Sequence, residues 1–172
     1  MSLAFHASPP PGEWLNDPNG LVRVDGCWRL FVQHRADAPA FRATGWARLS
    51  SPDLLDWTWD GPVIAPAGDD WAYSGSVTGD GGGLVATHTV HNAATGLERQ
   101  ARRTSADAGA SWSAAVEIIA AAANCRDPFV CDGGKAMLLA RPCDWTDATT
   151  ASHIAIWRLA GTTWRDKAYT AA

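Results

Sequence analysis

Close to its N-terminus the chain reads Trp14-Leu15-Asn16-Asp17-Pro18-Asn19-Gly20, a stretch that places one carboxylate between two amides and a turn. The proline fixes its own φ angle, and the Asn and Gly after it tolerate positive φ, so the stretch favours a tight turn. The alternating residues 21–24 then predict a strand. A carboxylate on a tight loop that feeds a sheet is rigidly held, as a group that attacks one atom of a substrate must be. The stretch therefore indicates a functional site around Asp17, with an ordinary Asx turn as the alternative.

Further short motifs follow along the chain, each with a plain structural reading. They are Trp28-Arg29-Leu30-Phe31-Val32-Gln33, the run from Trp46 to Trp57, Tyr73-Ser74-Gly75-Ser76 and Arg126-Asp127-Pro128. Alone, they indicate a polar strand end, a packing tryptophan, a bulge and a surface ion pair. In this order and spacing behind the first stretch, they resemble the signature of glycoside hydrolase family 32, the invertases, inulinases and levanases that release β-fructosyl units. The chain departs from the family pattern at Ala47 and Arg48, where that pattern has Gly and His.

The resemblance implies the roles of eight residues. It makes Asp17 the nucleophile of a retaining hydrolase and Asp127 a carboxylate that binds fructosyl hydroxyls and stabilises the transition state. It places around the sugar the substrate-binding residues Asn16, Gln33, Trp46, Tyr73, Ser74 and Arg126, with Trp46 as a wall of the pocket. Since Arg126 is a bidentate donor, we expect a lowered pKa for Asp127 if the two pair, and Pro128 favours an extended Asp127.

The general acid/base is missing from this pattern. Retaining glycosidases need two carboxylic groups about 5 Å apart, a nucleophile and an acid/base. The family draws the acid/base from a Glu, often followed by Cys, beyond its Arg-Asp-Pro motif. The glutamates of this chain are Glu13, Glu98 and Glu117, and all precede Asp127. Glu98 is expected on a strand near the cleft, but none has the context of the acid, which we expect just beyond residue 172.

Composition and repeats predict an all-β fold. The chain has 172 residues with 10 Trp, 16 Gly and 10 Pro, a composition that fits many short strands broken by turns. Strand groups that end in a Trp near a turn recur at intervals of about 50 residues, as propeller blades do. They predict blades at 14–57, 71–112 and 121–164. Residues 105–112 also match the Asp-box pattern of sialidases, which is a fold-stabilising turn and says little about substrate.

The family fold is a five-bladed propeller, so about three blades are expected here, and residues 1–172 form the N-terminal portion of the glycosidase domain. Three blades cannot close a ring, and their open faces need a cover. The alternatives are the remainder of a longer chain, a second subunit encoded separately, a fragment retained after cleavage, and domain-swapped self-association. A complete small β-sandwich or barrel remains the other fold. In function, the alternative to hydrolysis of sucrose, inulin or levan is a fructoside-binding fragment without the acid.

Charge and motif content limit the other partners. A net charge of −4 and no extended basic cluster argue against nucleic acid, and no stretch has the apolar length of a membrane helix. No signal-like segment opens the chain, so we expect a cytoplasmic protein. Its cysteines are then free thiols, although a Cys125–Cys131 bridge is the alternative in an oxidising compartment. A strand places His88 and His91 on opposite faces, so no metal is expected, and no cofactor. The four cysteines are Cys27, Cys125, Cys131 and Cys143.

Overall fold

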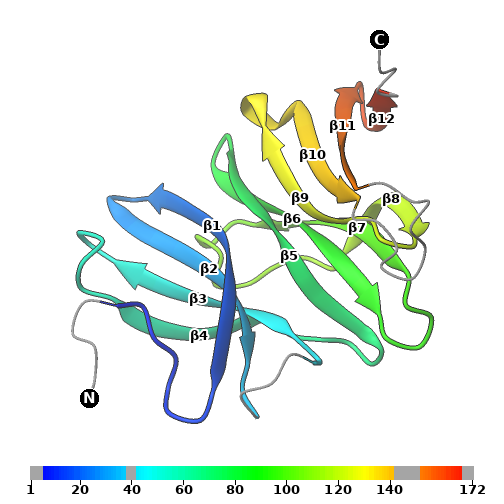
Figure 1. Cartoon of the computed structure of the whole chain (residues 1–172). Coiled ribbons are helices and arrows are strands. Elements are labelled where there is room, and N and C mark those ends of the chain that lie inside the picture. The colour runs from blue at the N-terminus through cyan, green and yellow to red at the C-terminus, as the bar shows by residue number, and fades with distance from the viewer. Residues whose placement is uncertain (1–5, 38–41, 142–151, 168–172) are drawn as a thin grey trace.

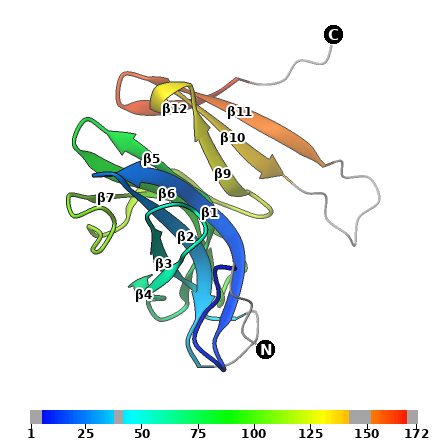
Figure 2. The same ribbon diagram turned by 90° about the vertical axis from the view of Figure 1, so that its left-hand side faces the viewer.

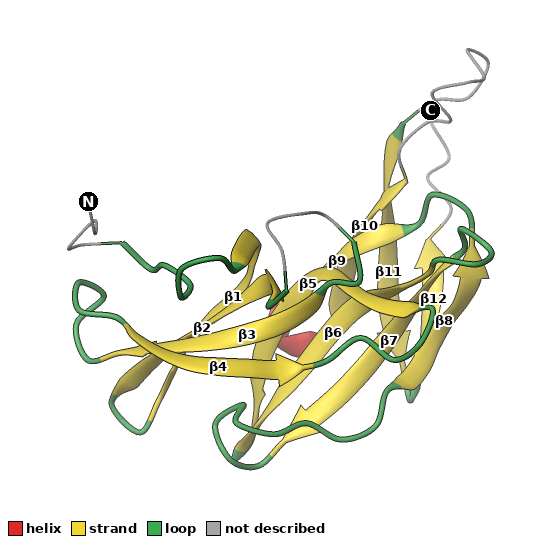
Figure 3. Ribbon diagram, turned by 90° about the horizontal axis from the view of Figure 1, so that it is seen from below, coloured by secondary structure: helices red, strands yellow, loops and turns green. Residues whose placement is uncertain are grey.

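The computed structural model describes residues 6–37, 42–141 and 152–167 (Figure 1). These residues form twelve β-strands and one short 3-10 helix, η1 (Asp132–Gly134). Figure 3 shows the same content by colour, with strands dominating the molecule. The strands build three four-stranded antiparallel sheets, each made from consecutive strands. The predicted all-β fold with about three propeller blades is confirmed.

Each sheet is a simple meander. The first contains β1 (Trp14–Val24), β2 (Cys27–Arg35), β3 (Gly45–Ser51) and β4 (Thr58–Ile64). The second contains β5 (Asp70–Asp80), β6 (Gly83–Asn92), β7 (Glu98–Ser105) and β8 (Val116–Ala122). The third contains β9 (Arg126–Cys131), β10 (Ala136–Arg141), β11 (His153–Ala160) and β12 (Thr163–Lys167).

The first two sheets extend one strand beyond the ranges 14–57 and 71–112 that the sequence predicts. Trp57 and Trp112 lie in the turns before the outer strands β4 and β8, rather than at the ends of the sheets. Trp57 shows this directly, because its indole N–H donates to the carbonyl of Leu54, inside the same turn, at 3.1 Å.

The first strands of the three sheets lie side by side in the order β1, β5, β9 (Figures 1 and 2). The contact between β1 and β5 depends on Gly20, since a Cβ added there would lie 2.7 Å from Cβ of Val77. Between β5 and β9, the Ser76 hydroxyl donates to the carbonyl of Pro128 and accepts from the N–H of Val130, both at 3.0 Å. These inner strands carry most of the predicted site residues, so their contacts determine how those residues meet.

Two apolar cores join the sheets face to face. Between the first and second sheets, Phe31 and Trp46 are fully buried with Ile64, Val77 and Leu84. The second core, between the second and third sheets, contains Val130, Met137 and Leu139, packed against Ile118 and Ile119 of β8. Burial of each large side chain contributes about 2 kcal/mol. Sheet-on-sheet packing of this kind holds the inner strands in fixed relative positions.

Two similar turns lead into the outer strands of the first and second sheets. In the second sheet, the Ser105 hydroxyl donates to Asp107 at 2.7 Å and accepts from the N–H of Gly109 at 2.9 Å. Asp107 also accepts from the N–H of Ser111 at 2.9 Å. In the first sheet, Asp53 accepts from the N–H groups of Leu55 and Asp56, each at 2.9 Å. The Asp-box pattern is therefore a structural turn, as the sequence analysis proposed.

The third sheet has one buried and one exposed apolar face. Its Val130, Met137 and Trp157 pair across three strands and pack toward the second sheet. On the other face, Phe129 and Ile156 pair across Leu138 and are 58% and 37% exposed. Among the described residues, this row leaves one face of the third sheet partly uncovered.

Cys27, Cys125 and Cys131 are free thiols in the structure, so the alternative bridge between the last two is not formed. Cys143 lies outside the described residues. Within the described ranges, no helix has the length and apolar character that crossing a lipid bilayer requires.

Candidate active site

A cavity of about 440 Å³ opens where the three sheets meet at the inner strands. Its lining includes seven of the eight residues that the sequence predicts, contributed by β1, β2, β5 and β9: Asn16, Asp17, Gln33, Tyr73, Ser74, Arg126 and Asp127. The cavity therefore brings together residues that lie more than a hundred positions apart in the chain. Trp46 is the predicted residue that it leaves out.

Asp17 lies within strand β1 and not on a tight turn before it, which corrects the expectation from the sequence. The pairing of β1 with β2 shifts register between Leu15 and Pro18 and again between Pro18 and Gly20. Such bulges accommodate a proline, which has no N–H to give to the ladder. The local irregularity turns the Asp17 side chain toward the cavity, where the Ser74 hydroxyl donates to its Oδ2 at 2.5 Å.

The two amides beside Asp17 have different surroundings. Asn16 lines the cavity. Asn19 is 2% exposed and its Oδ1 accepts from the N–H of Gly75 at 3.2 Å, so it fastens β1 to β5. The hydroxyl of Ser74, and not an asparagine, is thus the side-chain donor that the structure gives to Asp17.

Gln33 presents an unsatisfied acceptor. Its side chain is 2% exposed, and its Oε1 has no hydrogen-bond partner among the described residues. A buried polar atom without a partner is costly unless a ligand or water completes it. Because Gln33 lines the cavity, a sugar hydroxyl entering there would supply the missing donor.

Trp46 is not a wall of the pocket, in contrast to the prediction. It is fully buried in the core between the first two sheets, and its indole N–H donates to the carbonyl of Tyr73 at 2.9 Å. It therefore supports the backbone of a cavity residue from behind. The aromatic surface in the cavity is Tyr73 itself, which stacks on His91 with ring centroids 4.6 Å apart and planes at 3°.

Asp127 has a positive φ of 60°, so the extended conformation expected from Pro128 is not formed. Asp is one of the few residues that tolerate this left-handed region. The hydroxyl of Thr89 accepts the N–H of Asp127 at 2.9 Å and helps to hold that conformation. Tertiary contact with the second sheet therefore overrides the local preference set by the proline.

The pKa of Asp127 is raised above its usual value, so the net lowering that was expected if Asp127 pairs with Arg126 is not found. The side chain is 45% exposed, but it lines a recessed cavity. Partial burial in that cavity raises its pKa, Arg126 opposes the shift, and the charges of Asp17 and Glu98 add to it. The guanidinium of Arg126 offsets only part of this rise in pKa, because its Nε lies 3.6 Å from Oδ2 of Asp127. Arg126 is also shared, with its Nη1 3.5 Å from Oε1 of Glu98.

Four residues of the cavity lining were not predicted to belong to the site: His91, Gly96, Glu98 and Asn124. Glu98 was expected only near the cleft, and His91 was considered only as a metal ligand. A sequence pattern could have indicated Glu98, since it alternates with Gln100 along a strand. The two polar residues lie on one face of that strand, and both are buried. Glu13, in contrast, lies outside the cavity lining and pairs with His34 at 2.6 Å.

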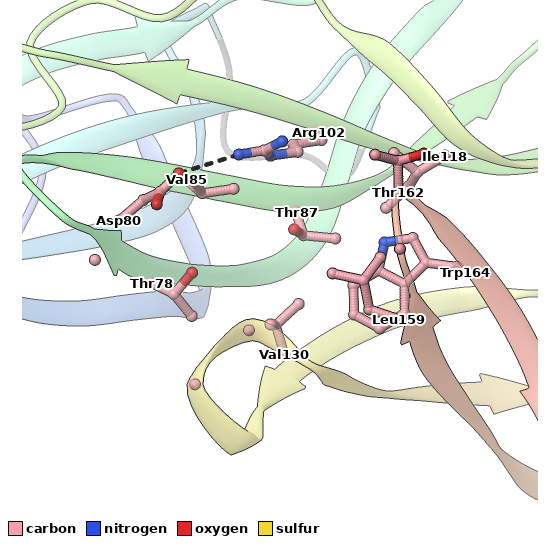
Figure 4. Close-up of a pocket in the computed structure, with 14 residues that line it drawn as sticks. Thr78, Asp80, Val85, Thr87, Arg102, Ile118, Val130, Leu159, Thr162 and Trp164 are labelled. Atoms are coloured by element: carbon pink, nitrogen blue, oxygen red, sulfur yellow. Dashed lines mark hydrogen bonds and ion pairs between the residues drawn. The ribbon is translucent and has the colours of Figure 1, made fainter.

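A second cavity of about 340 Å³ lies between the second and third sheets and has different chemistry (Figure 4). Its walls are largely threonine and apolar side chains, with Leu159 and Trp164 on one side. Its acidic group, Asp80, is already paired with Arg102 at 3.2 Å. The first cavity instead brings together Asp17, Glu98 and Asp127 with most of the predicted residues, which makes it the candidate active site.

Known proteins resemble this chain in sequence and in fold. Residues 6–157 match the model of the glycosyl hydrolases family 32 N-terminal domain. Raffinose invertase from Escherichia coli is 37% identical over 91 residues, which cover 51% of this chain and 19% of that protein. Invertase from Wickerhamomyces anomalus is 40% identical over 81 residues, which cover 44% of this chain and 14% of that protein.

Among solved structures, sucrose-6-phosphate hydrolase from Lactobacillus gasseri matches with a TM-score of 0.80 and 29% identity, over 95% of this chain and 35% of that chain. Exo-inulinase from Aspergillus awamori matches with a TM-score of 0.77 and 22% identity, over 95% of this chain and 38% of that chain. This second match shows a likeness of fold. The matches thus span 19% or less of the curated relatives named here and 38% or less of the solved chains.

Proposed function

Because the chain belongs to the glycosyl hydrolases family 32 N-terminal domain family, we propose that it forms the nucleophile-bearing part of a retaining glycosidase. The glycosidase would release terminal β-fructosyl units from sucrose or fructans. The relatives named as raffinose invertase and invertase, and a solved fructan 1-exohydrolase bound to 1-kestose, support this class of substrate.

The observation that carries the proposal is the meeting of Asp17 and Asp127 in one cavity, from the first and third sheets. Around them stand groups suited to sugar hydroxyls. Gln33 has an acceptor without a partner in the part of the chain that the structure describes, Ser74 carries a hydroxyl, and Arg126 carries a guanidinium. A cavity with several convergent polar groups and a carboxyl of shifted pKa is typical of an enzyme site.

In the proposed reaction, Asp17 attacks the anomeric carbon of the fructosyl unit. The bond from that carbon to the leaving oxygen breaks, and a fructosyl ester of Asp17 forms. The hydrogen bond from Ser74 to Oδ2 fixes the carboxylate and leaves Oδ1 for the attack. Asp127 accepts hydrogen bonds from fructosyl hydroxyls and, as an anion, stabilises the positive charge of the oxocarbenium-like transition state.

The second half of the reaction needs an acid/base that we place outside residues 1–172. That group protonates the leaving oxygen, then takes a proton from the water that attacks the anomeric carbon and releases Asp17. The exposed apolar row of Phe129, Leu138 and Ile156 supports further blades on the third sheet. The small share of each relative that this chain covers supports them as well.

The first test is the intact mass of the purified, denatured protein. A second polypeptide beside the 18.3 kDa chain, or a larger species, would identify the polypeptide that completes the propeller. Release of fructose from sucrose and inulin is then measured on that assembly. A lone 18.3 kDa chain that binds fructose without turnover would instead favour a non-catalytic fructoside-binding fragment.

The decisive variant is Asp17→Ala in the complete assembly. We expect fructose release to fall by at least about 10³-fold, because removal of a covalent nucleophile leaves only binding and electrostatic effects. Circular dichroism and the melting temperature should be unchanged. Asp69→Ala, an exposed Asp outside the cavity, is the matched control and should retain full activity. Turnover by Asp17→Ala at the rate of the control would refute the assignment.

A further inference from the structure

Glu98, the first residue of β7, is a buried carboxylate in the cavity wall that the reaction above does not use. It is 3% exposed. An ionised carboxylate at such a position is unfavourable unless donors surround it. Its Oε2 accepts the N–H of Cys125 at 2.9 Å, and its Oε1 lies 3.5 Å from Nη1 of Arg126 and 3.7 Å from Nδ1 of His91.

These contacts converge on the segment that precedes Asp127. The carbonyl of Cys125 accepts from the side-chain amide of Gln100 at 2.6 Å. The hydroxyl of Thr89 donates to Oε1 of Gln100 at 2.8 Å and accepts the N–H of Asp127 at 2.9 Å. Three side chains of the second sheet thus hold the backbone on which the third sheet begins.

The clamp formed by Thr89, Glu98 and Gln100 explains the unusual backbone of Asp127. A left-handed residue other than glycine costs about 1 kcal/mol or more and persists where its surroundings hold it. Thr89 and Gln100 are 0% exposed and Glu98 is 3% exposed, so the hydrogen bonds of the clamp are shielded from water. The direction in which Asp127 points is therefore determined largely by the neighbouring sheet.

Glu98 differs from the other two clamp residues because it carries charge. The guanidinium of Arg126 lies between two carboxylates, 3.5 Å from Glu98 and 3.6 Å from Asp127. A cation shared in this way cannot satisfy Asp127 fully, which leaves oxygen lone pairs of Asp127 for a ligand. Both oxygens of Glu98 face N–H groups of the protein, the arrangement of an acceptor rather than of an acid that gives a proton to a leaving group.

We propose that Glu98 is a positioning residue: it holds the backbone at Cys125 and draws Arg126 away from Asp127, so that the Asp127 carboxylate stays free to bind the fructosyl unit. This inference rests on the proposed function for its catalytic consequence. The geometry itself concerns only residues of this chain.

The test is Glu98→Gln, which keeps the size and one acceptor for the N–H of Cys125 but removes the charge. We expect kcat for sucrose to fall by about 10-fold or more, with a smaller change in KM. The acid limb of the pH profile should move to lower pH, because a negative charge near Asp127 is lost and Arg126 is released toward it. The control is Glu117→Gln, an exposed glutamate on β8 that pairs with Arg99, and it should leave both quantities unchanged.

A second measurement does not depend on turnover. The carboxyl of Asp127 is titrated by carbon NMR in the wild type and in Glu98→Gln, where its pKa should be lower. An unchanged Asp127 titration, or an unshifted acid limb with wild-type kcat, overturns the inference. A complete wild-type assembly that releases no fructose counts against the proposed function instead, and the titration still decides the role of Glu98.

Glu98→Asp is a second variant, which keeps the inference testable if Glu98→Gln does not fold. It keeps the charge but withdraws it from Arg126 by one methylene. Reduced turnover at an unchanged melting temperature is expected, and wild-type turnover would contradict a role in positioning.

Discussion

The carboxylates of Asp107 and Asp127 lie in contrasting parts of the molecule. Asp107, in the outer turn of the second sheet, accepts hydrogen bonds from Ser105 and Ser111, both within four positions of it. These bonds hold its pKa well below the usual range. Asp127, at the inner strand of the third sheet, receives its backbone support from Thr89 on another sheet, and partial burial raises its pKa.

The two carboxylates differ in which parts of the chain surround them. In the outer turn, close neighbours in the chain stabilise a charge, and that charge in turn stabilises the turn. In the cavity, distant parts of the chain hold a charge whose surroundings do not favour it, as is typical of functional groups. Stability and the proposed chemistry thus reside in different carboxylates, which can be altered separately.

Between these two carboxylates, the largest expected effect comes from Asp127→Asn, which keeps the shape but removes the charge. We expect kcat for sucrose to fall by about 100-fold or more, since an electrostatic interaction with the transition state is lost. The change in KM should be smaller and the melting temperature should not fall. Steady-state kinetics measure kcat and KM, and a thermal melt measures the melting temperature. A variant that loses affinity alone, with normal kcat, would remove Asp127 from the transition state.

The next effect is a difference in pH dependence between the two carboxylates. Activity needs Asp127 as an anion, so its acid limb should lie above about pH 3.9, the usual value for Asp. A raised folded-state pKa also means that Asp127 destabilises the fold as pH rises through that pKa. The lowered pKa of Asp107 acts in the opposite sense, giving stability above the unfolded value that is lost as pH falls through the folded one.

Melts of the wild type, Asp127→Asn and Asp107→Asn between pH 3 and pH 7 separate these contributions. The Asp107 variant should lose less stability on acidification than the wild type does. Parallel curves for all three proteins would show that the two environments do not differ as described.

The smallest effects are expected at the outer turns. Asp107→Ala should lower the melting temperature by several degrees, because three side-chain and backbone donors lose their acceptor. Asp53→Ala should lower it less, because Asp53 serves two backbone donors and one hydroxyl at the longer distance of 3.2 Å. Fructoside binding should be unaffected in both. A larger shift for Asp53 would reverse the ranking of the two turns.

The same contrast explains what could be predicted from the sequence. The turn of Ser105 to Trp112 and the three repeated sheets follow from local patterns, so both were predictable from the residues alone. Seven of the residues that line the cavity were identified by their resemblance to family motifs, whereas the position of Trp46 and the pKa of Asp127 were misjudged. Both features depend on packing between sheets. Trp46 is covered by the second sheet, and Asp127 shares the guanidinium of Arg126 with Glu98. No short stretch of sequence contains that information.

The meander connectivity has a consequence for how the protein is made. Each sheet consists of strands that are adjacent in the chain, so each can pair as soon as its last strand has left the ribosome. The cavity cannot form at that pace, because its walls come from three sheets and one of them begins at Arg126. During synthesis, the nascent protein would carry two finished sheets before Asp127, on the third, is made.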